Sequence, residues 1–175
     1  IFASYLGNQK DPIYVDCSSP NQSNKIIRFV KNLKEDKRLA VFIHEMLHAC
    51  FWDFSEESID HGSIDCARAL WRFGYRLESD ETPRPAKDPS CIIIRNKKYY
   101  FNRVHSLPQG CNSYIISPFE KNKTILFRKS LKKEQELHQL IKSCLCISYW
   151  DVDDEAISEA SEDIGRALWR FGYRK

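Results

Sequence analysis

The sequence repeats itself: residues 69–76 read ALWRFGYR, and residues 167–174 read ALWRFGYR again. At the same offset of 98 positions, residues 19–76 align with residues 117–174 without a gap, and 27 of the 58 aligned positions are identical. Self-similarity of this extent is the signature of an internal repeat. The sequence therefore predicts a tandem duplication of one small unit.

The repeat divides the chain into a first copy, residues 1–76, and a second copy, residues 91–175. Residues 77–90 (LESDETPRPAKDPS) are polar, contain three prolines and show no apolar periodicity, which is typical of a linker. The second copy opens with an apolar run, residues 91–95, and a further run follows at residues 99–104, a pattern that predicts a hairpin. The first copy has no counterpart of residues 91–95, so we expect it to lack this opening strand.

Each copy combines strands with helices. Residues 25–30 (KIIRFV) and 123–128 (KTILFR) are rich in β-branched and aromatic residues, which favours strands. Apolar residues then recur at helical spacing over residues 35–52, and a second helix is expected to run to about Phe73. These patterns predict an α+β fold in which each copy has a small β-sheet and two helices.

The ends of the second helix carry their own signals. Asp53 precedes Glu56 by three residues, a spacing that resembles a capping box at a helix start. Gly74 follows the last apolar residue, where a left-handed glycine commonly ends a helix, and Gly172 occupies the same place in the second copy.

Composition limits the class of protein. The chain has 175 residues, of which 42% are hydrophobic and 29% charged, with a net charge of +3, so we expect a soluble globular protein whose charge does not indicate nucleic-acid binding. No apolar run reaches the roughly 18 residues that predict a membrane span, and no signal peptide is visible. Seven cysteines without a disulfide-like spacing indicate a reducing compartment, the cytoplasm.

Residues 44–48 read HEMLH, an H-E-x-x-H motif within a predicted helix. His44 and His48 are four residues apart and share a helix face, so both imidazoles can bind one zinc ion. Glu45 lies beside them and can accept a proton from a water molecule that zinc activates. The motif therefore predicts a zinc site with Glu45 as general base.

A catalytic zinc usually has a third protein ligand. His61, on the second helix, is the favoured candidate, and Glu57 is the alternative. Asp65 is either a hydrogen-bond partner of a ligand imidazole or a structural residue. The second copy cannot form the same site, because the candidates His44, Glu45, His48 and His61 align with Lys142, Ser143, Cys146 and Glu159.

The motif and the His61-Gly62 pair on the next helix resemble the SprT-like zinc metallopeptidases. Residues 44–57 (HEMLHACFWDFSEE) also resemble short metallopeptidase-like proteins that are often phage-encoded. The resemblance implies a minimal zincin fold, His44 and His48 as zinc ligands, and Glu45 as base. For a phage-encoded protein it implies the host cytoplasm.

Three functions are compatible with the sequence. The favoured one is a zinc-dependent metallopeptidase that acts on a protein or peptide, with the second copy a non-catalytic partner packed on the first. The alternatives are a non-enzymatic protein-binding module with a structural or relic zinc site, and a DNA-associated SprT-like protease. Nucleic acid is possible as a partner but is not indicated, and a membrane is not expected.

Overall fold

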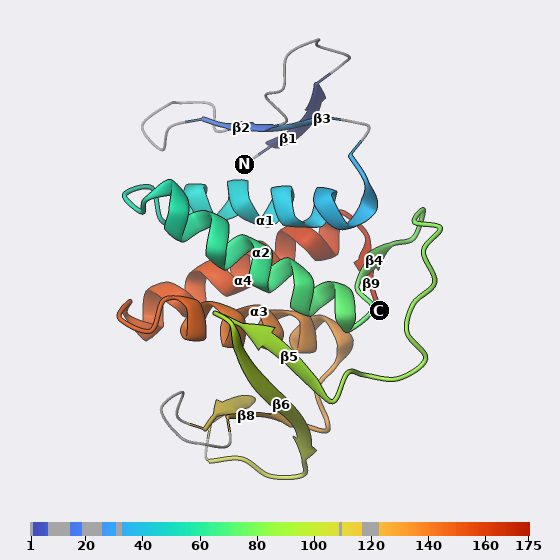
Figure 1. The fold of residues 1–175 in the computed structure, drawn as a ribbon, viewed down its shortest axis with the longest axis vertical. Helices are drawn as coiled ribbons and strands as arrows, with labels where there is room; N and C mark the ends of the chain where they lie inside the picture. Colours follow the sequence, from blue (N-terminus) through green and yellow to red (C-terminus); the bar gives the residue numbers. More distant parts are fainter. Residues whose placement is uncertain (1, 7–14, 19–25, 31–32, 109, 117–122) are drawn as a thin grey trace.

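Four helices lie between two small sheets in the described part of the chain (Figure 1). The computed structural model describes residues 2–6, 15–18, 26–30, 33–108, 110–116 and 123–175, without the side chains of residues 2–6, 15–17 and 28–30. The mixture of helices and small sheets confirms the α+β class. No helix in these ranges is long and apolar enough to cross a membrane.

The first sheet packs on helix α1 (Glu35–Cys50), and the second packs mainly on helix α3 (Lys133–Ser148). The first sheet has the order β1-β3-β2, with β1 (Phe2–Leu6), β2 (Val15–Cys17) and β3 (Ile26–Val30). The second sheet has the order β5-β6-β8-β7, with β5 (Cys91–Ile94), β6 (Lys97–Val104), β7 (Ser113–Ile115) and β8 (Thr124–Arg128).

The strand registers of the two sheets coincide when 98 is added to the residue numbers of the first sheet. β1 runs parallel to β3 with Phe2 opposite Ile26, and β6 runs parallel to β8 with Tyr100 opposite Thr124. The antiparallel pairs β2–β3 and β7–β8 show the same correspondence. The internal repeat of the sequence thus has a counterpart in the fold.

β5 is the additional strand of the second sheet and forms the predicted hairpin with β6. Arg95 and Asn96, which connect the two strands, have positive φ angles of 50° and 58°. Two consecutive residues with positive φ are the requirement of a type I′ turn, whose twist matches that of the flanking strands. The prediction of a hairpin over residues 91–104 is confirmed.

The cap of the second helix of each half lies two residues later than predicted. α1 ends at Cys50, and α2 (Glu56–Arg72) begins after Ser55, whose Oγ accepts a hydrogen bond from the Ser58 N–H at 3.3 Å. In the second half, Asp153 caps α4 (Asp154–Arg170). The prediction of Asp53 as the cap was wrong, because the turn after α1 continues through residue 54. Glu56 is therefore the first residue of α2 and not a capping partner.

The repeated octapeptide builds the same helix ending twice. Arg76 stacks on the Trp71 ring, 3.1 Å from its centroid, and donates to the Trp71 carbonyl at 2.7 Å. Arg174 and Trp169 repeat this arrangement at 3.7 Å. The chain reverses before each arginine at a left-handed glycine, as predicted, and the two tails pair as the antiparallel strands β4 (Arg76–Leu77) and β9 (Tyr173–Arg174).

One cluster of buried apolar residues spans both halves, because α2 packs against α3. Tyr149, at the end of α3, donates a hydrogen bond to the Ser58 carbonyl on α2 at 2.9 Å. Its ring lies over Gly62, where an added Cβ would be 2.0 Å from the phenol oxygen. Glycine at position 62 therefore permits the close contact between the halves.

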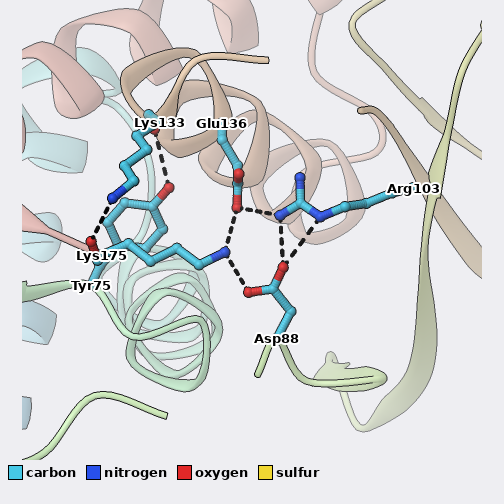
Figure 2. A network of polar contacts seen from close by, with 6 residues as sticks. All are labelled: Tyr75, Asp88, Arg103, Lys133, Glu136 and Lys175. Carbon is cyan, nitrogen blue, oxygen red and sulfur yellow. Dashed lines mark hydrogen bonds and ion pairs between the residues drawn. The ribbon is translucent and has the colours of Figure 1, made fainter. Parts of the chain in front are cut away.

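The linker is fastened at both ends. Near its start, Asp80 pairs with Arg38 on α1. Near its end, Asp88 lies beside buried Glu136 of α3, and both carboxylates bind Arg103 of β6 and Lys175, as Figure 2 shows. These ion pairs hold residues 77–90 against the helices.

Candidate metal centre

The histidine motif lies on the side of α1 that faces the start of α2. Leu39, Ile43 and Leu47 form the fully buried stripe of α1. His44 and His48 each follow a residue of this stripe by one position, so they lie at its edge, with side chains 16% and 18% exposed. Because α1 and α2 are joined by a short turn, the first turn of α2 lies opposite both imidazoles.

Three donor groups converge at this edge. The Glu56 carboxylate has one oxygen 3.1 Å from His44 Nε2 and the other 3.1 Å from His48 Nε2. The two Nε2 atoms are themselves 3.1 Å apart. A tetrahedral zinc ion, with bonds of 2.0–2.1 Å, holds neighbouring ligand atoms roughly 3.3 Å apart. The spacing and chemistry of these donors therefore fit a metal ion.

Asp60 supports this arrangement from the next turn of α2. Its Oδ1 lies 3.1 Å from His44 Nδ1. A proton on Nδ1 that is donated to this carboxylate leaves the Nε2 lone pair directed at Glu56 and His48. Carboxylates orient metal-binding imidazoles in this way.

The pKa of His44 also favours a ligand. Burial lowers it, as does the neighbouring His48, while the carboxylates of Glu56 and Asp60 act in the opposite direction; the net shift is downward. An imidazole must be neutral to bind a metal, so the lowered pKa extends the pH range in which His44 can do so.

Glu45 lies next to these donors but is more deeply buried. Its side chain is 10% exposed, and Oε1 is 4.0 Å from His44 Nε2. A carboxylate at this distance is too far for a hydrogen bond to the imidazole, and it is close enough to reach a small molecule held between them.

The structure brings together some of the residues selected from the sequence and not others. His44, His48 and Glu45 lie together, whereas His61 is exposed on α2 and is not part of the donor cluster. Glu57 is likewise exposed and outside it. Asp65 is buried and accepts a hydrogen bond from the Arg95 N–H at 2.7 Å, so it holds the β5–β6 turn.

Glu56 was predicted to be a capping partner and not a ligand, and no role was predicted for Asp60. The signal that could have found them is their spacing: two carboxylates four residues apart, in the first turns of the helix that follows the motif, share one face. Asp154, in the second half, occupies the position that corresponds to Glu56.

The second half shows the same four positions in contact, with a lysine in place of His44. The Lys142 ammonium lies 3.0 Å from the Asp154 carboxylate and donates to Ser158 Oγ at 2.6 Å. Cys146 Sγ lies 3.8 Å from the other Asp154 oxygen. Lys142, Cys146, Asp154 and Ser158 correspond to His44, His48, Glu56 and Asp60.

Comparisons of the chain with known protein families, with curated proteins and with solved structures find no match.

Proposed function

We propose that this chain is a zinc-dependent metallopeptidase whose metal is held by His44, His48 and Glu56. The observation that supports the proposal is the convergence of two imidazole nitrogens and a carboxylate at mutual distances of 3.1 Å. Two nitrogens and one oxygen are a known ligand set of catalytic zinc, in which the fourth position stays available to water or substrate.

The second half offers independent support. There the carboxylate at the corresponding position meets a permanent cation, the Lys142 ammonium. In the first half the residue at that position is an imidazole with a lowered pKa, and a second imidazole lies beside it. A metal ion would supply the cation that lysine supplies in the other half.

The residues present divide the work of peptide hydrolysis between them. Zinc, when bound, polarises a peptide carbonyl and lowers the pKa of a water molecule. Glu45 takes the proton that the water loses as its oxygen attacks the carbonyl carbon. Glu45 then delivers this proton to the nitrogen of the departing amine as the C–N bond breaks. Asp60 keeps the proton of His44 on Nδ1 throughout.

The ligand set is tested by metal content. Elemental analysis of the purified protein should find about one zinc ion per chain, and Glu56→Gln should lower the affinity for zinc at least tenfold. Glu57→Gln and His61→Ala are matched controls, because both residues are exposed neighbours outside the cluster. If His61→Ala loses zinc and Glu56→Gln keeps it, the proposed third ligand is wrong.

The reaction is tested separately. Glu45→Gln should retain zinc and lose hydrolysis of an unstructured protein such as casein by a factor of at least one hundred, since it removes the general base. Full activity in this variant would contradict the mechanism. Bound zinc without hydrolysis in the unaltered protein would instead favour a protein-binding module with a structural zinc site.

A further inference from the structure

A groove of about 700 Å³ begins one helical turn from the metal centre. On α1 its wall includes Ala40, four residues before His44, and on α2 it includes Ile64, four residues after Asp60. Residues four apart lie on the same helix face, about 6 Å along the axis. The groove and the donor cluster therefore occupy successive stretches of the same seam between α1 and α2.

The surface of the groove is apolar with a basic rim. Ala40, Ala67, Ile64 and Ile93 supply apolar surface, and the two isoleucines are 38% and 53% exposed. The rim carries three cations against one carboxylate: Lys37, Arg68 and Arg72, with Asp36. No ion pair joins these three cations to another residue in the described ranges.

The far wall of the groove is a strand that can receive an extended chain. Among the described residues, β5 is an edge strand of its sheet, with β6 paired along one side and no strand along the other. Ile92 is buried, and Ile93 projects from the opposite face of the strand. An edge strand of this kind can pair with a peptide backbone, while neighbouring apolar surface receives alternate side chains.

The second half, which lacks the histidine cluster, fills the corresponding space. His138 stands at the position of Ala40 and packs directly on Gly165, the counterpart of Ala67: an added Cβ at Gly165 would lie 2.2 Å from His138 Cδ2. Burial lowers the pKa of His138, in keeping with a neutral packed imidazole.

The basic rim is reduced there as well, because Gln135 replaces Lys37. Glu162 replaces Ile64, and Arg166, the counterpart of Arg68, lies 4.0 Å from Glu162 and 3.4 Å from Asp163. At the positions compared, the first half thus has open apolar surface with an unpaired Arg68, where the second half has a packed His138 and a paired Arg166.

We propose that this groove binds the peptide substrate, and that it selects an extended segment in which aliphatic side chains are flanked by aspartate or glutamate. The inference rests on the proposed function and specifies its substrate class. Aliphatic side chains would cover Ile64 and Ile93, and the flanking carboxylates would meet Lys37, Arg68 and Arg72.

The test measures binding in Glu45→Gln protein loaded with zinc, so that hydrolysis does not interfere. The probes are two fluorescein-labelled octapeptides with a central pair of leucines, one flanked by glutamates and the other by lysines, and the readout is fluorescence anisotropy. The glutamate peptide should bind at least tenfold more tightly, and the difference should shrink as salt increases. Equal affinities for the two peptides would overturn the proposal.

Two sets of variants locate the binding. Ala40→His with Ala67→Gly copies the filled half and should weaken binding of the glutamate peptide at least tenfold while zinc content stays the same. Arg68→Glu should weaken it about fivefold or more, whereas Arg166→Glu, at the paired counterpart, should not. Unchanged binding in both the filled variant and Arg68→Glu would refute the groove as the site. If the peptide binds as expected and unaltered protein does not cleave it, the peptidase function fails and the groove assignment stands.

Discussion

The second half should become a metal site when Lys142 and Cys146 are both replaced by histidine. Asp154 already lies where Glu56 lies in the first half, and Ser158 lies where Asp60 lies. The two replacements place imidazoles four residues apart on α3, opposite the first turn of α4, which is the arrangement seen for His44 and His48. The change is best made in protein that also carries His44→Ala and His48→Ala, so that any zinc measured is bound at the new site.

The energetic cost of losing the Lys142–Asp154 ion pair should be small. Lys142→His removes an ion pair with Asp154, whose side chain is 76% exposed. Exposed pairs of this kind contribute about 0.2–1 kcal/mol, so loss of the Lys142–Asp154 pair should lower the unfolding free energy of the metal-free protein by at most about 1 kcal/mol. Zinc at one hundred times its Kd should then add about 2.7 kcal/mol. For a chain of this size that gain corresponds to a rise in Tm of roughly 5–10 °C.

The assay is zinc content by elemental analysis, together with thermal unfolding with and without zinc. The background protein should hold no zinc, and K142H/C146H should hold about one ion per chain. Addition of Asp154→Ala is the control, since it removes the carboxylate and should abolish the gain. A folded K142H/C146H protein that binds no zinc would refute the equivalence of the two sites, and zinc binding that survives Asp154→Ala would exclude the carboxylate as a ligand.

Two further predictions concern stability. Gly165→Ala should destabilise the protein by about 1–3 kcal/mol in urea unfolding, because its Cβ would overlap His138, and His138→Ala in the same chain should recover most of that loss. Burial would raise the pKa of Asp88, but hydrogen bonds from Lys175 and Arg103 outweigh it and the pKa is lowered; the stabilisation is therefore present above the unfolded-state pKa, about 4, and is lost as pH falls through the lower folded-state value. Asp88→Asn should accordingly be less stable than the unaltered protein near pH 7. The difference in unfolding free energy should disappear below the folded-state pKa of Asp88, as measured by urea unfolding at several pH values.

The fold could be predicted to the extent that local patterns determine it. Apolar residues at helical spacing located both helices of each half, and two apolar runs around Asn96 located the hairpin. Gly74 and Gly172 were predicted to end their helices in a left-handed conformation, and both have positive φ angles. These features depend on residues close in sequence, which is why they could be read without tertiary contacts.

The third donor could not be found in the same way, because it depends on how α2 packs against α1. His61 lies five residues after Glu56, which turns it about 140° around the helix axis. The two side chains therefore cannot both face the histidines of α1, and the packing of α2 on α1 decides which one does. The spacing of Asp53 and Glu56 also led to a different role for Glu56, that of a capping partner at the start of the second helix.

The carboxylate of Glu56 and Asp154 has the same place in both halves. In each half it ends the seam between two antiparallel helices and faces a group that is, or can bind, a cation. The halves differ at this point, because the first has His44 and His48 where the second has Lys142 and Cys146. They differ again one helical turn away, where the first has Ala40 and the second has His138. Because the second difference lies on the same seam as the first, the groove opens beside the donor cluster. A metal that only stabilised the fold would not need that opening, so the location of the groove favours a site that receives a ligand.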